Sequence, residues 1–218
     1  MSKLLNSTIQ KTQIKLNCEL HFGVSSLNNS SLNNHFFPED LPEDWRISYY
    51  SNEFNLLVIH LSDLNLISQK EDKVPGEQII EQLTDILDDI EKTVFCVFNC
   101  SKLSESICRQ LFESPIAAED NSYLIDLDKP GENLLIGHST HIEWGNACVA
   151  GSIGETASRD LFCNVKSDKK IEPVELKILI EHTQHYALSK DARTVSIIFS
   201  SDYALENYRN TVLLESMM

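Results

Sequence analysis

The stretch PGEQIIEQLTDILDDIEKTVFCVFN, residues 75–99, decides the fold class of this chain. In its first part, isoleucine and leucine recur at intervals of three and four residues, which gives a helix one apolar stripe opposite an acidic face. Its second part, TVFCVFN (93–99), is a continuous apolar run typical of a strand buried on both faces. A similar run, NLLVIHL (55–61), precedes the helix. Strand, helix and strand in this order predict a βαβ unit and a parallel sheet.

The patterns on either side extend this prediction to one α/β domain over residues 1–218. Strands are expected at 19–25 and 194–201, and the serine- and asparagine-rich residues 25–34 are expected to form a loop. The middle third has strand-like runs separated by a Lys-Pro-Gly turn, which indicates antiparallel pairing. We therefore expect a TIM-barrel-like or partial barrel with mainly parallel strands and an irregular middle section.

The C-terminal part contains two further predicted helices. The first spans about residues 172–190, with Pro173 in its first turn. The second follows the strand at 194–201, and Asp202 is placed to cap it. Neither an internal repeat nor a low-complexity linker divides the sequence, which supports a single domain.

The charge balance excludes some classes of partner. The chain has 18 basic and 33 acidic residues among 218, a formal net charge of −15. Such a charge repels phosphate backbones and anionic lipids, so we expect neither nucleic-acid nor membrane binding. The N-terminus lacks the continuous apolar core of a secretory signal, so a cytoplasmic location is expected. The six cysteines are accordingly interpreted as reduced thiols.

An aromatic segment, FFPEDLPEDWRISYYSNEFNLLVI (36–59), raises the question of family. Together with FGVSSL (22–27) it resembles the YecE-like family, domain of unknown function seventy-two, whose members look like TIM barrels. Residues of matching type, order and spacing are Gly23, Ser25, Phe37, Pro38, Leu41, Trp45, Tyr50 and Phe54. The resemblance implies a loop–helix–strand unit of a barrel, with Trp45 and Tyr49 on the buried face of the helix.

The same resemblance draws attention to the end of the second strand. The family has an acidic and an amide residue where this chain has Val58 and His60, so a family pocket would be altered here. Because active sites of TIM barrels lie at the carboxyl ends of the strands, we expect any pocket to contain Ser25, Ser26, His60 and Cys100. Cys100 is the best placed cysteine nucleophile, although a structural thiol is the favoured interpretation.

Two histidine pairs are candidate metal ligands. His138 and His141, with Glu143 nearby, fall on a strand and turn, where spacing of three residues does not bring ligands together. His182 and His185 share a helix face but lack an identifiable third ligand. We expect no metal and no cofactor at either pair.

Three functions remain open on the sequence. The preferred interpretation is a binding or interaction module on a diverged YecE-like barrel, without established catalysis. The alternative is an enzyme that acts on a small molecule at the carboxyl-end mouth of the strands. The third is a homo-oligomer that covers the edge of a shortened barrel, since an unpaired edge favours association.

Overall fold

The computed structural model describes residues 18–61, 76–90, 93–100, 103–114, 122–125, 133–136, 140–146 and 160–218. The elements within these residues, in chain order, are β1 (Glu19–Val24), α1 (Ser30–His35), the 3-10 helix η1 (Glu43–Trp45), α2 (Arg46–Ser51), β2 (Leu56–His60), α3 (Gly76–Asp88), β3 (Phe95–Asn99), α4 (Glu105–Phe112), β4 (Ser122–Ile125), β5 (Asn133–Ile136), β6 (Thr140–Asn146), β7 (Asp160–Ser167), α5 (Pro173–Ser189), β8 (Thr194–Ser200) and α6 (Ala204–Glu215). Strands and helices alternate over most of this order, as the sequence predicts for an α/β protein.

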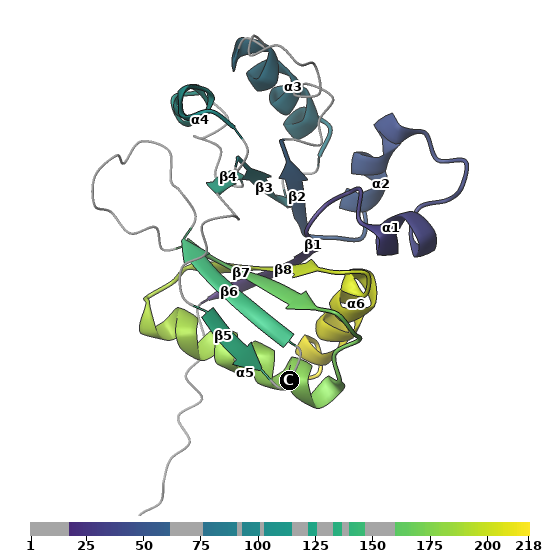
Figure 1. Ribbon diagram of the computed structural model, residues 1–218, viewed down its shortest axis with the longest axis vertical. Helices are drawn as coiled ribbons and strands as arrows, with labels where there is room; N and C mark the ends of the chain where they lie inside the picture. Colours follow the sequence, from purple (N-terminus) through teal and green to yellow (C-terminus); the bar gives the residue numbers. More distant parts are fainter. Residues whose placement is uncertain are drawn as a thin grey trace, which may run out of the picture.

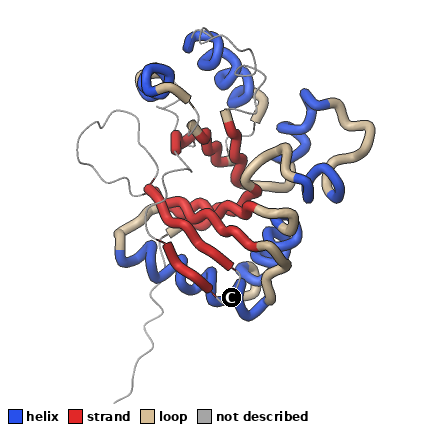
Figure 2. The backbone as a smooth tube through the Cα atoms, in the orientation of Figure 1, coloured by secondary structure: helices blue, strands red, loops and turns tan. Residues whose placement is uncertain are grey.

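The strands form two sheets (Figures 1 and 2). One has the order β2-β3-β4 and is entirely parallel. The other has the order β1-β8-β7-β6-β5, with parallel pairing from β1 to β7 and antiparallel pairing from β7 to β5. The mainly parallel sheet and the antiparallel middle section are thus confirmed. The described strands leave both sheets open, so they form no closed barrel.

Side chains join the two sheets between β1 and β2. The Val24 amide donates to the Tyr50 hydroxyl at 2.9 Å, and that hydroxyl donates to the Leu56 carbonyl at 3.1 Å. The Phe22 amide donates to Asn55 Oδ1 at 3.0 Å. Because these side chains satisfy groups that a strand ladder would otherwise satisfy, β1 and β2 lie close without pairing directly.

The approach of β1 to β2 depends on a glycine. A Cβ atom at Gly23 would lie 2.4 Å from the Leu56 carbonyl oxygen, which is a backbone atom. Any larger residue would force the two strands apart. The glycine of the predicted first strand therefore allows close packing between the sheets.

The strands bury two different faces. The outer face of both sheets belongs to one large apolar core, which includes Val24 of β1, Leu57 of β2, Phe98 of β3 and Phe199 of β8. Helices α5 and α6 cover this face of the five-stranded sheet (Figure 1). The inner face carries a second, smaller cluster made of Leu56, Val58, Val97, Phe162 and Ile198, with Phe95 packed against it. Since these residues come from β2 and β3 and from β7 and β8, the inner faces of the two sheets pack on each other.

Three local expectations were wrong. Ser30–His35 is helix α1, where a loop was expected, because the Asn29 side chain accepts from the Ser31 amide and caps the helix. Asp202 makes no cap on α6; it accepts a hydrogen bond from the Ser30 hydroxyl. Trp45 and Tyr49 are not on the buried face, since 64% and 39% of their surfaces are exposed.

The buried aromatic residues are Tyr50, the next residue after Tyr49 along α2, and Phe54, which lies between α2 and β2. Tyr50 and Phe54 are each 1% exposed, and their rings stack at 3.9 Å between centroids. They fill the space beneath β2, which explains why the sequence is rich in aromatic residues here. Within the described residues, no helix has both the length and the apolarity needed to cross a membrane.

Candidate functional site

A row of polar residues crosses the carboxyl ends of five strands on the inner face. Lys166 of β7 is in register with Ser200 of β8, and His60 of β2 is in register with Asn99 of β3. Ser25 connects the two pairs: its amide donates to Phe199 of β8, and its carbonyl accepts from His60. Because side chains alternate along a strand, these residues share the face of Leu56, Val58, Phe162 and Ile198. We call the set Lys166, Ser200, Ser25, His60 and Asn99 the inner row.

His60 is held by hydrogen bonds at both ring nitrogens. Its Nε2 contacts the Ser25 carbonyl, which can only accept, so Nε2 carries the hydrogen. Its Nδ1 lies 2.8 Å from Asn99 Nδ2, and in the neutral ring this nitrogen accepts from the amide. The side chain is half-buried at the end of β2. The two contacts fix the orientation and the tautomer of the imidazole.

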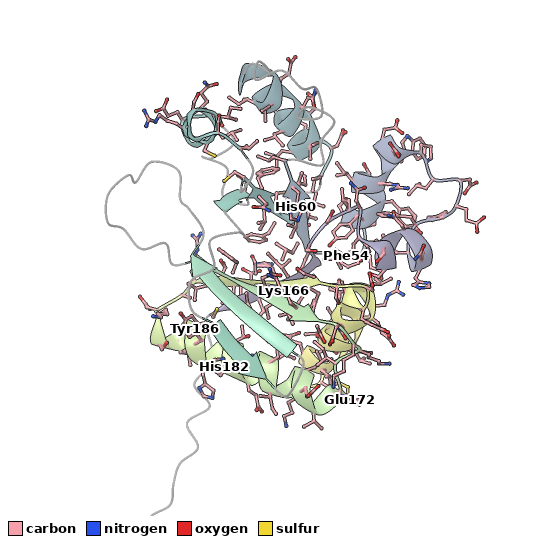
Figure 3. All side chains as sticks on the ribbon, in the orientation of Figure 1. Phe54, His60, Lys166, Glu172, His182 and Tyr186 are labelled. Carbon is pink, nitrogen blue, oxygen red and sulfur yellow. The ribbon has the colours of Figure 1, made fainter. Side chains whose placement is uncertain are left out.

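The β7 and β8 side of the inner row has its own hydrogen bond. The Ser200 hydroxyl donates to Asn164 Oδ1, whose side chain is buried two residues before Lys166 on the same face of β7. Lys166 itself is exposed. Figure 3 shows His60 on the three-stranded sheet and Lys166 on the five-stranded sheet, on either side of the boundary between them. The inner row thus combines a fixed imidazole, the Asn99 amide, the Ser200 hydroxyl, the Ser25 carbonyl and a cation, and the Asn164 amide lies beside it.

Of the four residues expected in one pocket, the structure brings Ser25 and His60 into contact and places Ser26 and Cys100 elsewhere. His60 and Ser25 are in contact, although through the Ser25 carbonyl and not through its hydroxyl. Ser26 lies in the following turn, where its hydroxyl accepts from the Asn28 amide at 3.0 Å. Cys100 belongs to the large core on the outer face, and its carbonyl is 3.9 Å from the Cys108 sulfur. Cys100 therefore lies on the opposite side of β3 from the inner row.

Sequence reasoning missed Asn99, Asn164, Lys166 and Ser200. A signal for them was present, because Asn99, Asn164 and Ser200 each follow an apolar residue of the inner cluster by two positions along the strand, and Lys166 follows Asn164 by two. The signal needed knowledge of which face the two sheets share. That information comes from packing between strands distant in sequence.

Two of the described thiols, those of Cys96 and Cys163, are buried and have raised pKa values. The described cysteines form no disulfide. Burial raises the pKa of Cys96 to about 12 and raises the pKa of Cys163 as well, so both remain protonated at neutral pH. A nucleophilic cysteine needs the opposite shift. These two thiols therefore act as apolar packing groups.

Of the two histidine pairs considered as metal ligands, only one lies within the described side chains. Among the described side chains, no group of three histidine, cysteine or acidic residues is arranged to hold a metal ion. His182 and His185 lie on α5, with His185 exposed and His182 half-buried; Figure 3 labels His182 on this helix. His138 lies outside the described residues, as do the side chains of His141 and Glu143.

Comparison with known proteins found no relative of this chain. No family model matches the chain, and no match was found among the curated proteins or the solved structures. What the fold and the site define is thus a class by geometry alone: a mixed α/β protein with two open sheets and a polar inner row at the carboxyl ends of its parallel strands.

Proposed function

We propose that this protein binds a small polar molecule at the inner row. The observation that carries the proposal is that Lys166, Ser200, His60 and Asn99 share one face at the carboxyl ends of four strands. In α/β proteins, ligands bind where the carboxyl ends of parallel strands bring polar groups together. The apolar inner cluster lies directly beneath and gives this row a rigid base.

The ligand that fits the inner row carries an anionic group. Lys166 supplies a positive charge, and none of the other members of the row is acidic. The Asn99 amide, which donates a hydrogen bond to His60, is a second polar group of the row on the β3 side. A carboxylate or phosphate placed at the row would gain charge-assisted hydrogen bonds, which are stronger than neutral ones.

Binding is favoured over catalysis because of the state of His60. A general base needs a ring nitrogen that can take a proton from the substrate. In His60, Nδ1 accepts from Asn99 and Nε2 donates to a backbone carbonyl. Cys100 is on the other face of β3 and cannot serve as its nucleophilic partner.

An enzyme that acts on a small molecule is the second candidate. The observation in its favour is that His60 is half-buried at the carboxyl end of a strand, where TIM-barrel active sites are placed. In this case substrate binding would have to displace Asn99 from Nδ1. A pH-dependent activity lost in His60→Gln would favour this candidate.

The barrel and family hypotheses remain part of the proposal. We propose that the two sheets are the halves of a diverged YecE-like barrel. Their strand orders, β4-β3-β2 and β1-β8-β7-β6-β5, follow the order of strands around an eight-stranded barrel, with no ladder among the described strands between β1 and β2 or between β4 and β5 and with β6 antiparallel to its neighbours. The reduced cysteines support a cytoplasmic location, and the outer strands β4 and β5 are edges at which a homo-oligomer could form.

The binding proposal is tested by titrating the protein with citrate and with inorganic phosphate while ¹⁵N chemical shifts are followed. We expect saturable shifts at Asn99 and Lys166. Lys166→Gln should weaken binding about tenfold or more, because a hydrogen bond to a charged group is lost. Lys169→Gln is the matched control, since Lys169 is an exposed lysine three residues away and outside the inner row. Equal affinities of the two variants would contradict the proposal.

A further inference from the structure

A groove of 410 Å³ lies on the surface away from the inner row, where η1 and α2 meet the end of α3. Its lining includes Asp44 and Trp45 of η1, Ser48 and Tyr49 of α2, and Asn52 just beyond that helix. Asp89, which follows α3, completes the other side. Cavities of about 300–1,000 Å³ are of the size that holds small molecules. The groove shares no residue with the inner row.

Two exposed aromatic side chains mark this groove. Trp45 is 64% exposed and Tyr49 is 39% exposed, although neighbouring aromatic residues of the same segment are buried. The Tyr49 ring is supported by Phe36 and Phe37, whose centroids lie 5.2 and 6.2 Å away. The groove therefore has aromatic side chains that are partly fixed and still accessible.

The described residues that line the groove carry negative charge only. Asp44 and Asp89 approach it from two different elements, and both are exposed. Neither lysine nor arginine is among the described residues that line it. Arg46, the nearest cation in sequence, donates to Asn33 Oδ1 at 3.1 Å and lies over the Phe37 ring. The carboxyl end of α3 adds the negative end of a helix dipole and has no basic residue in its last turn.

We propose that this groove binds a linear organic cation with at least two ammonium groups, of the polyamine class. Ammonium groups are attracted to the faces of indole and phenol rings. Metal ions such as Mg²⁺ and Ca²⁺ are bound by oxygen ligands, so a site for them has no need of aromatic side chains. The carboxylates of Asp44 and Asp89 can each pair with one ammonium group of the same flexible ligand. Asn52 donates its amide hydrogen to the Ser48 carbonyl at 2.9 Å, so its Oδ1 is left on the accepting side for an ammonium group.

The proposal is tested by calorimetric titration with spermidine at low ionic strength. We expect saturable binding that Trp45→Ala and Asp89→Asn each weaken about five- to tenfold, since both a cation–π contact and a charge pair are involved. Tyr203→Ala and Asp85→Asn are matched controls: Tyr203 is an exposed aromatic residue, and Asp85 is an exposed acid of α3, neither of them lining the groove. The controls should bind spermidine as the unchanged protein does.

Three results would overturn the proposal. One is the absence of saturable heat with spermidine at millimolar concentration. Another is equal weakening by the controls, or binding of Mg²⁺ with the same affinity, which would mean a diffuse counter-ion effect. The third is binding of a lysine-rich peptide without binding of spermidine, which would identify the groove as a protein-docking surface. Because Trp45 and Asp89 are exposed, their substitution leaves the core intact, and thermal unfolding checks this. The result is independent of ligand binding at the inner row.

Discussion

The outer and inner faces of the strands differ in composition. The outer faces of β1, β2, β3, β7 and β8 belong to one apolar core, which helices cover. The inner face has a small apolar cluster at its base and changes to polar residues at the carboxyl ends. Because successive side chains of a strand point to opposite faces, the residues that stabilise the fold are separated from those available to a ligand. The difference explains why Cys100 and His60, both near strand ends, cannot act together.

Two adjacent leucines on β2 allow the most direct test of the difference between the two faces. Leu56 points to the inner cluster and Leu57 to the outer core, and both are fully buried. We expect Leu57→Ala to lower the free energy of unfolding by about 4 kcal/mol and Leu56→Ala by about 2–3 kcal/mol, since the smaller cluster has fewer neighbours around the lost side chain. Denaturant titration of both variants measures the difference. A larger loss for Leu56→Ala would reverse the assignment of the faces.

The contact between β1 and β2 should be almost as sensitive. In Gly23→Ala the new Cβ would meet the Leu56 carbonyl at 2.4 Å. We expect a loss of about 2–3 kcal/mol in the free energy of unfolding, the usual cost of overpacking. Circular dichroism during thermal unfolding measures it. A variant as stable as the unchanged protein would mean that β1 and β2 do not approach as closely as described.

The hydroxyl that joins these strands should contribute less. Tyr50→Phe removes the acceptor of the Val24 amide and the donor to the Leu56 carbonyl, and leaves both groups buried. The expected loss is about 2 kcal/mol. Tyr49→Phe is the matched control on the neighbouring, partly exposed tyrosine and should change stability by less than about 0.5 kcal/mol. Equal effects of the two substitutions would remove the special role of Tyr50.

These residues also show how far the sequence alone could lead. The apolar periodicity around residues 75–99 predicted α3, β3 and the parallel sheet, because those signals are local. It could not choose which of Tyr49 and Tyr50 is buried, since that depends on where β1 packs. His60 and Ser25 were expected in one pocket because active sites of TIM barrels lie at the carboxyl ends of the strands, and they are in contact through the Ser25 carbonyl. Asn99 and Lys166 were missed because the face that they share is created by contacts between distant strands.

The smallest expected effect concerns alkaline pH. Burial raises the pKa of Cys96 to about 12 from 9.0, and raises that of Cys163 too. The folded state thus holds these protons more tightly than the unfolded chain, so stability is full below pH 9 and falls as the pH rises from 9 toward 12. At pH 9 the loss is under about 1 kcal/mol per thiol.

Denaturant titrations between pH 7 and pH 10 measure this dependence. Cys96→Val removes one buried thiol with little change in volume and should flatten the decline. Cys18→Ser alters a thiol that is only partly buried and should leave the decline unchanged. A decline that Cys96→Val does not alter would assign the pH dependence to other groups.

The central claim is that the two sheets share one inner face whose carboxyl ends form the inner row. Nuclear Overhauser contacts test it most directly, between the methyl groups of Val58 on β2 and those of Ile198 on β8. The account predicts clear cross-sheet contacts for this pair, and for Leu56 with the Phe162 ring, because these residues form one cluster. Absence of both contacts, in a protein that retains the β7–β8 ladder, would contradict it.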